Sequence, residues 1–235
     1  GPERTSGTEV PGAIGNDRAR QDRQQWSVPV KRTGALCGGE SAGRGWLAAL
    51  LWLATSAAAL AGDFVYTTNS PATNTITITG YTGPGGAVTI PGTVDGFAVT
   101  AIGFGAFEET TNITSVAISD GVSNIEVSAF FDSSSLTNVT IPASVTNIGG
   151  AAFQYCRELT GIGVDALNPI YSSAAGVLFD LGQADLIQCP GGKAGSYTIP
   201  NSVAGVEGGA FGGCVKLTSV TIGSGATNIG ADLFA

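Results

Sequence analysis

The chain has 235 residues, of which 43% are hydrophobic and only 12% are charged, so it can bury a substantial apolar core. Residues 62–235 carry 13 acidic and 3 basic side chains, a net charge of −10, whereas residues 1–61 carry 5 acidic and 7 basic ones. So few cations after residue 61 leave no basic stripe that could neutralise phosphates, which excludes nucleic acid and anionic membrane surfaces as partners.

An apolar run from Trp46 to Ala61 indicates that residues 1–61 are a leader outside the mature fold. The run follows Arg44 and ends in Ala-Leu-Ala, which is the pattern of a secretory signal peptide over residues 46–61. We expect cleavage after Ala61 and a secreted or cell-surface location. The alternative is a membrane-spanning helix, but the 16 residues of the run fall short of the ~20 that a span needs. The mature chain is therefore expected to contain no membrane span.

Residues 62–90 are expected to form an N-terminal β cap. Thr and Ile alternate from Thr75 to Thr79, which is typical of a half-buried strand. A Gly-Pro-Gly-Gly turn at residues 83–86 follows, and Val88-Thr89-Ile90 forms the next short β segment. This segment would cover the first unit of the repeat that comes after it.

Residues 91–235 contain a repeat that is best anchored on phenylalanine. The anchors are Phe107, Phe130, Phe153, Phe211 and Phe234, at steps of 23, 23, 58 and 23 residues. Between two anchors the clearest copy runs Leu136-x-x-Val139-x-Ile141 and then proline. A unit of this length with this pattern is typical of leucine-rich repeats. We therefore predict a mostly β fold, a leucine-rich-repeat solenoid of stacked 23-residue coils with short parallel strands.

Three further expectations follow from the anchors. Because Phe107, Phe130, Phe153 and Phe211 share one place in the repeat, they are expected to form one buried ladder. The 58-residue step holds a 12-residue insertion, around residues 170–190, and residues 177–187 are predicted to be a small hairpin that projects from the stack. A further strand would be due after Phe234, so the array is expected to be truncated at its C-terminus.

Two copies of the repeat carry a closer resemblance. Phe153-Gln-Tyr-Cys156-Arg-Glu-Leu159 and Phe211-Gly-Gly-Cys214-Val-Lys-Leu217 resemble BspA-like leucine-rich repeats, a bacterial and protist surface-protein family. The resemblance covers about Ile90 to Ala235, and it departs from the family pattern where Thr110 and Ser133 replace the cysteine. It implies an exported or surface-displayed module, often adhesive, with an insertion like one found in the family and without catalytic residues to carry over.

Cysteine usage leaves one question open. Cys37 lies in the leader, and the mature part has three cysteines, Cys156, Cys189 and Cys214. An odd number cannot pair completely within one chain. Export permits disulfides, but the favoured interpretation is that these are small buried core residues.

No pattern of catalytic or metal-binding residues emerges. Residues 39–43 fit the G-x-S-x-G motif of esterases, but the chain has no histidine to act as the base. Scattered cysteines without histidine do not make a zinc site. The carboxylates that could pair on successive coils do not share a repeat position; they are Asp120, Asp132, Asp165, Asp180, Asp185 and Asp232. We therefore expect a protein that is not an enzyme and has no cofactor or metal, with a polysaccharide-acting enzyme as a remote alternative.

Two functions remain: an adhesin-like module for an unidentified protein or glycan, which we favour, and a passive structural spacer of a larger surface protein. The insertion favours binding, because a spacer would need no interruption of its array. The first candidate surface is its tip, with Asp180, Gln183 and Asp185. The second is the outer strand face, a small, polar and nearly uncharged surface that includes Ser115, Asn138, Thr140, Ser219 and Thr221.

Overall fold

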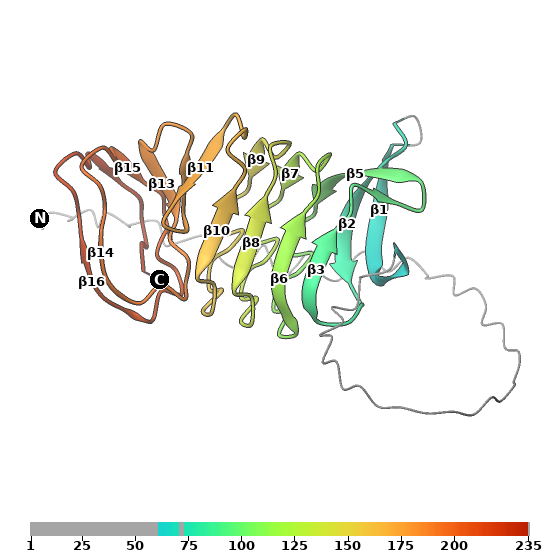
Figure 1. Ribbon diagram of the computed structural model, residues 1–235, viewed down its shortest axis with the longest axis horizontal. Helices are drawn as coiled ribbons and strands as arrows, with labels where there is room; N and C mark the ends of the chain where they lie inside the picture. The colour runs from blue at the N-terminus through green and yellow to red at the C-terminus, as the bar shows by residue number, and fades with distance from the viewer. Residues whose placement is uncertain (1–60, 71–72, 235) are drawn as a thin grey trace, which may run out of the picture. The chain divides into compact units, whose positions relative to one another are not determined.

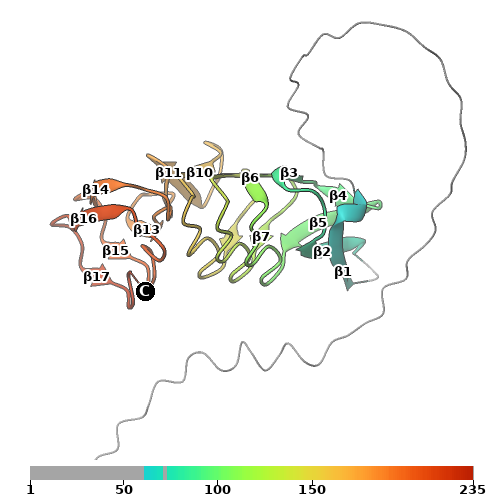
Figure 2. The ribbon, with the colours of Figure 1, turned by 90° about the horizontal axis from the view of Figure 1, so that it is seen from below.

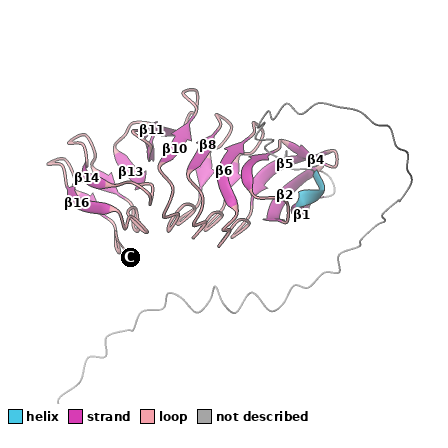
Figure 3. Ribbon diagram, turned by 60° about the horizontal axis from the view of Figure 1, so that its bottom comes forward, coloured by secondary structure: helices cyan, strands magenta, loops and turns pink. Residues whose placement is uncertain are grey.

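The computed structural model describes residues 61–70 and 73–234. The predicted leader, with its signal peptide and the motif at residues 39–43, lies outside the described residues except for Ala61. The described part consists of short strands and one 3-10 turn, Ala61–Asp63, and Figure 3 shows strands and loops throughout the repeat region. Within residues 61–70 and 73–234, no helix is long and apolar enough to cross a membrane.

The chain winds into a solenoid whose strands stack in sheets on two faces (Figure 1). The strands of one face, in hydrogen-bonding order, are β1 (Phe64–Ser70), β2 (Thr75–Tyr81), β5 (Phe97–Ile102), β7 (Asn124–Ile125) and β9 (Asn147–Ile148), with β4 (Thr93–Val94) paired to β5. The strands of the other face are β3 (Gly86–Ile90), β6 (Ile113–Ile118), β8 (Asn138–Ile141) and β10 (Gly161–Val164). Each coil passes once through both faces.

Two further sheets follow in the C-terminal part. One contains β11 (Tyr171–Ala174), β12 (Val177–Asp180), β13 (Asp185–Gln188), β15 (Gly205–Val206) and β17 (Asn228–Ile229). The other contains β14 (Gly195–Thr198) and β16 (Leu217–Thr221). Figure 2 shows the coils from below, with β10 and β11 side by side where the two parts meet.

The register confirms the predicted solenoid of 23-residue coils. Val139 of β8 pairs in parallel with Val116 of β6 on one side and with Ile162 of β10 on the other, and each partner is 23 residues away. Strand β2 pairs in parallel with β5, and β3 pairs in parallel with β6. Strands β2 and β3 therefore already form a coil of the solenoid. Strand β1 instead runs antiparallel to β2 and covers its outer edge.

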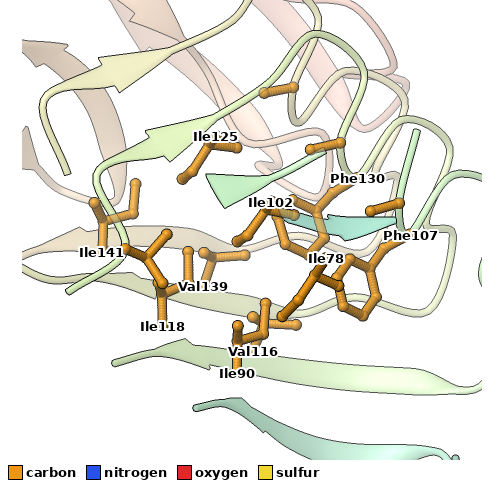
Figure 4. Packing of buried hydrophobic residues seen from close by; sticks show 14 of the residues in the cluster. Ile78, Ile90, Ile102, Phe107, Val116, Ile118, Ile125, Phe130, Val139 and Ile141 are labelled. Atoms are coloured by element: carbon orange, nitrogen blue, oxygen red, sulfur yellow. The ribbon is translucent and has the colours of Figure 1, made fainter. Parts of the chain in front are cut away.

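The core lies between the two faces. In β8 the side chains of Val139 and Ile141 are buried, whereas those of Asn138 and Thr140 are exposed, because alternate residues of a strand point to opposite sides. Figure 4 shows these buried side chains facing others that come from the opposite face, such as Ile125. Each coil therefore gains its burial from its neighbours, as expected of a repeat protein.

The phenylalanine anchors form two stacks instead of one. Phe107, Phe130 and Phe153 stack with ring centroids 5.0 and 5.5 Å apart. Phe211 is also buried, but it belongs to a second core cluster and stacks on Phe234 at 5.2 Å. The prediction of one continuous ladder is therefore wrong at Phe211. The carbonyl oxygen of Ala210 accepts from the backbone N–H of Cys189, at the end of the insertion, where a regular coil would present the N–H of Phe153.

The substitution of serine for cysteine in the repeat has a simple physical basis. The Ser133 hydroxyl donates a hydrogen bond to the carbonyl oxygen of Phe107 in the preceding coil, at 2.7 Å. One coil later, the Cys156 thiol donates in the same way to the carbonyl oxygen of Phe130, at 3.0 Å. Both side chains are small, buried donors that join adjacent coils, so either residue fits. All three described cysteines are buried, in agreement with their interpretation as small core residues.

Candidate functional site

The insertion interrupts the stack between β9 and β13. Strand β12 pairs antiparallel with both β11 and β13, and regular parallel pairing resumes between β13 and β15. The three consecutive apolar residues of β12 are all buried. Leu178 packs into the N-terminal core cluster, whereas Val177 and Phe179 pack into the C-terminal one. The expectation that the hairpin projects from the stack is therefore wrong, because the side chains of β12 are buried in the two core clusters.

Side chains from β11 bond to the strands that the interruption leaves at an edge. The Tyr171 hydroxyl accepts a hydrogen bond from the backbone N–H of Ile148 in β9, at 2.9 Å. The Ser173 hydroxyl accepts one from the backbone N–H of Val164 in β10, at 3.2 Å. Burial raises the pKa of Tyr171, so its hydroxyl stays protonated at neutral pH. The edge of β9 is thus closed by the Tyr171 side chain, where a further strand would normally pair. The edge of β10 is closed by the Ser173 side chain and by the backbone carbonyl oxygen of Gly176, which accepts from the N–H of Ile162 at 2.9 Å.

One buried asparagine fixes the loop that leads into the insertion. Asn168 is 2% exposed, and its amide nitrogen donates to the carbonyl oxygens of Pro142 and Val145, each at 2.9 Å. Its amide oxygen accepts from the backbone N–H groups of Ile170 and Tyr171, at 2.9 and 2.8 Å. The amide thus uses both donors and both acceptor sites. This residue was not among the predicted site residues, although the Asn-Pro pair at residues 168–169 is a signal for a turn.

A cleft of about 310 Å³ lies at the interruption. Its polar lining includes Gln154, Asp180, Asp185 and Glu207, and its other lining residues include Ile148, Tyr171, Leu178 and Ile187. The Gln154 amide reaches across to the carbonyl oxygen of Gly208, at 3.4 Å. Four segments of the chain, at residues 148–154, 171–180, 185–188 and 207–208, therefore line the cleft. Three of the lining side chains are carboxylates.

The structure brings two of the three predicted insertion residues together in this cleft. Asp180 ends β12, and its carboxylate accepts hydrogen bonds from the backbone N–H groups of Asp185, at 2.7 Å, and Gly182, at 3.1 Å. Asp185 begins β13, where its carboxylate lies directly over Gly205 of β15, in space that any side chain on Gly205 would fill. Gln183 lies in the connecting loop with a positive φ of 53° and is not among the residues that line the cleft.

Large apolar side chains are exposed close to the acidic cleft. Leu167 is 82% exposed, Leu181 53% and Ile170 43%. Ile170 and Leu181 are neighbours, because the N–H of Leu181 donates to the carbonyl oxygen of Ile170 at 2.7 Å. Leu167 precedes Ile170 by three residues in the loop that leads into β11. We call Leu167, Ile170 and Leu181 the apolar patch of the insertion. The patch was not predicted, although Leu167 and Leu181 are large apolar residues in polar loop segments that have no place in the repeat.

The predicted strand face is divided into two parts. Ser115 pairs with Asn138 across β6 and β8, and Thr140 lies two residues further along β8. Ser219 and Thr221 belong to β16 in the separate two-stranded sheet, where they pair with β14. Thr140 also lines a shallow hollow of about 500 Å³ together with Asp120 and Asp165. The insertion therefore lies between the two parts of this face.

Among the described residues, no group of three or more His, Cys, Asp or Glu side chains is placed to hold a metal ion. Lys216 and Glu158 form an ion pair at 2.6 Å, and both side chains are exposed, by 40% and 54%. The carboxylates of the cleft are thus surrounded by amides, hydroxyls and apolar groups.

The repeat pattern and the register now have a direct counterpart among known families. The model of the BspA type leucine-rich repeat region matches residues 88–175 and 191–235, in six copies. The chain belongs to the BspA-type leucine-rich repeat family. This confirms the resemblance drawn from the Phe153 and Phe211 segments. The gap in the match, residues 176–190, falls on β12, its loop and β13, which is the segment that breaks the regular array.

Solved structures of bacterial leucine-rich repeat proteins are similar to this BspA-type chain. A leucine-rich repeat protein from Eubacterium ventriosum is 21% identical, with 67% of this chain and 57% of that chain covered and a TM-score of 0.46. One from Bacteroides ovatus is 22% identical, with coverages of 74% and 43% and a TM-score of 0.49. A leucine-rich cell surface protein from Faecalibacterium prausnitzii is 23% identical, with coverages of 74% and 72% and a TM-score of 0.37. No curated protein matches the chain.

Proposed function

We propose that this chain is an exported or cell-surface, non-catalytic module that binds a protein partner through its insertion. One observation carries the proposal: the apolar patch of Leu167, Ile170 and Leu181 is exposed near a cleft lined by three carboxylates. Membership of the BspA-type family and the predicted signal peptide support the location. The proposed binding surface is therefore the first one predicted from the sequence, the tip of the insertion, together with the apolar patch.

The chemistry of this surface favours a protein over a glycan. Protein interfaces combine a central apolar contact with a polar rim, and exposed large aliphatic side chains supply such a contact. The described residues carry 13 acidic and 3 basic side chains, so their charge complements a basic partner. We therefore propose a partner surface on which lysine or arginine side chains flank an apolar side chain.

A binding screen tests this proposal. The purified full chain would be tested against matrix proteins, envelope proteins and a glycan array, alongside the double variant Leu167→Ser/Leu181→Ser. We expect saturable binding to a protein, weakened at least about tenfold in the double variant, because truncating central apolar contacts removes well over 1.4 kcal/mol. Asp185→Asn with Glu207→Gln should mainly slow association and reduce its dependence on salt.

The matched control is Val65→Ser, which removes an apolar side chain that is 46% exposed on β1, at the N-terminal end of the solenoid. Its binding should equal that of the wild type. If the double variant binds as tightly as the wild type, the site moves to the strand face of Ser115, Asn138 and Thr140. If the wild type binds nothing, the proposal fails and the passive spacer is the remaining function.

A further inference from the structure

The cleft at the interruption presents hydrogen-bond acceptors to solvent, and none of the described side chains that line it is basic. We propose that the cleft is a pocket for the side chain of one lysine or arginine of the protein partner. This inference deepens the proposed function and rests on it. The apolar patch takes an apolar side chain of the partner, and the cleft takes the cationic side chain next to it.

A β-bulge turns a buried glutamine toward the cleft. Leu178 of β12 pairs with Gln188 of β13. The next residue of β12, Phe179, pairs with Leu186, so Ile187 is an extra residue on β13. Phe179 and Leu186 both lie in the C-terminal core cluster, whereas Leu178 and Gln188 both line the cleft. In a regular strand Leu186 and Gln188 would point to the same side, so the bulge is what brings a polar side chain to the cleft.

The amide of Gln188 leaves one acceptor for a ligand. Gln188 is 4% exposed, and its amide nitrogen donates to the carbonyl oxygens of Cys189, at 2.9 Å, and Ala210, at 3.1 Å. Both N–H groups are thus used, and the opposite orientation of the amide would set its oxygen against the same two carbonyl oxygens. Among the described residues, no group donates to the amide oxygen, and no fully buried side-chain oxygen lacks a partner. The amide oxygen therefore meets solvent in the cleft, where an N–H group of a ligand can take the place of water.

Two carboxylates add negative charge at the same place. Asp185 pairs with Gly205 of β15, and the backbone N–H of Glu207 donates to the carbonyl oxygen of Leu186 at 2.9 Å. Glu207 therefore lies two residues after Gly205 along the same strand direction, so its side chain is on the same face as that of Asp185. Both line the cleft together with Asp180. These like charges would repel an anionic ligand and favour a cation that donates hydrogen bonds.

The remaining walls fit the aliphatic stem of such a cation. Ile148, Tyr171, Leu178 and Ile187 contribute apolar surface to the lining. Lysine and arginine bury their methylene groups against apolar surface while the charged end reaches polar groups. The volume of about 310 Å³ is at the lower end of the range for ligand pockets, which suits one side chain.

The cleft also adjoins the apolar patch. Ile170 of the patch directly precedes Tyr171, and Leu181 directly follows Asp180. Tyr171 and Asp180 both line the cleft. A partner that places an apolar side chain on the patch therefore brings a neighbouring lysine or arginine to the opening of the cleft.

The test uses small probes, so it needs no identified partner. Proton–nitrogen correlation NMR spectra of the full chain would be recorded during titration with Nα-acetyl-lysine amide, Nα-acetyl-arginine amide and the neutral Nα-acetyl-norleucine amide. We expect a cationic probe to bind saturably, with a dissociation constant on the order of 1 mM for a ligand of this size. The norleucine probe has an aliphatic side chain without the charge and should bind at least about tenfold more weakly. The two cationic probes show whether lysine or arginine is preferred.

The signals that move locate the bound probe. The side-chain amide of Gln188 should shift with the cationic probes, because its oxygen gains a hydrogen bond. The backbone N–H signals of Gly182, Asp185 and Glu207 should shift at the same probe concentrations.

The double variant Asp185→Asn/Glu207→Gln should bind the cationic probes at least about fivefold more weakly, with unchanged binding of norleucine amide. The matched control Glu109→Gln/Asp120→Asn removes two charges from exposed positions in earlier coils that do not line the cleft. It should bind all three probes as the wild type does.

Three results would overturn the inference. They are the absence of saturable binding by both cationic probes, an equal affinity for the norleucine probe, and shifts that leave the Gln188 amide unmoved. Equal weakening by the control pair would show a general charge effect and count against it as well. Failure of the proposed function is distinct. A protein that binds through the apolar patch while the probes do not bind refutes only the cation pocket, whereas probe binding without any protein partner in the screen refutes the proposed function.

Discussion

Replacing Phe130 with alanine is expected to lower the free energy of unfolding by about 3–5 kcal/mol, as for other large aromatic side chains in a core. Phe130 is buried between Phe107 and Phe153, and its ring stacks on both at interplanar angles of 14° and 11°. Its removal leaves a cavity and also ends both ring contacts. Chemical denaturation of the wild type and the variant, followed by circular dichroism, measures the loss.

Phe104→Ala is the matched control, because it removes the same side chain from a position that is 57% exposed. We expect its effect to stay within about 0.5 kcal/mol, as for surface substitutions. A loss below about 1 kcal/mol for Phe130→Ala would contradict the stacked core that the register describes.

Replacing Asn168 with leucine is expected to cost about 3–5 kcal/mol. Leucine has a similar volume, but it leaves the carbonyl oxygen of Val145 without a buried donor and that of Pro142 with only the 3.4 Å bond from the Val145 N–H. It also leaves two backbone N–H groups without their acceptor. Each unsatisfied buried group costs about 1–3 kcal/mol. Because the loop holds Tyr171 against β9, hydrogen exchange at Ile148 should also become faster, and exchange measured by mass spectrometry checks this second effect.

Asn147→Ala provides the comparison for Asn168. The Asn147 side chain is exposed and donates one hydrogen bond to the Asn124 side chain, at 2.6 Å. Its loss should cost less than about 1 kcal/mol. Equal effects of the two asparagine variants would show that the Asn168 amide does not hold the insertion in place.

The sequence predicted the regular part of the fold because one period repeats in it. A side chain such as Val139 meets its equivalents 23 residues before and after it, so one copy of the pattern determines the environment of the next. The same reasoning failed at Phe211. Phe211 has the predicted position within its repeat unit and is buried as expected. The aromatic ring that it stacks on, however, depends on how the insertion packs between the coils, and the spacing of the repeat does not predict that packing.

The candidate site was predicted only in part for a related reason. Asp180 and Asp185 stood out because they are charged and lie in a break of the pattern. Glu207 and Gln154 belong to regular coils, and their approach to the cleft depends on the antiparallel pairing of β12 with β13. Val177-Leu178-Phe179 was a usable signal, since a run of three apolar residues without alternation indicates a strand buried on both sides.

The position of β12 between two core clusters has a consequence for the response of the module to mechanical load. A repeat array with one continuous core passes disorder from coil to coil, because each coil depends on the next. Here the two clusters contact β12 from opposite sides, so one side can lose its packing while the strand still covers the other. When the chain is pulled from its ends, we therefore expect the hydrogen bonds that join the two parts directly, such as Tyr155 N–H to Gly212 O, to break first, and the two core clusters to open in separate steps afterwards.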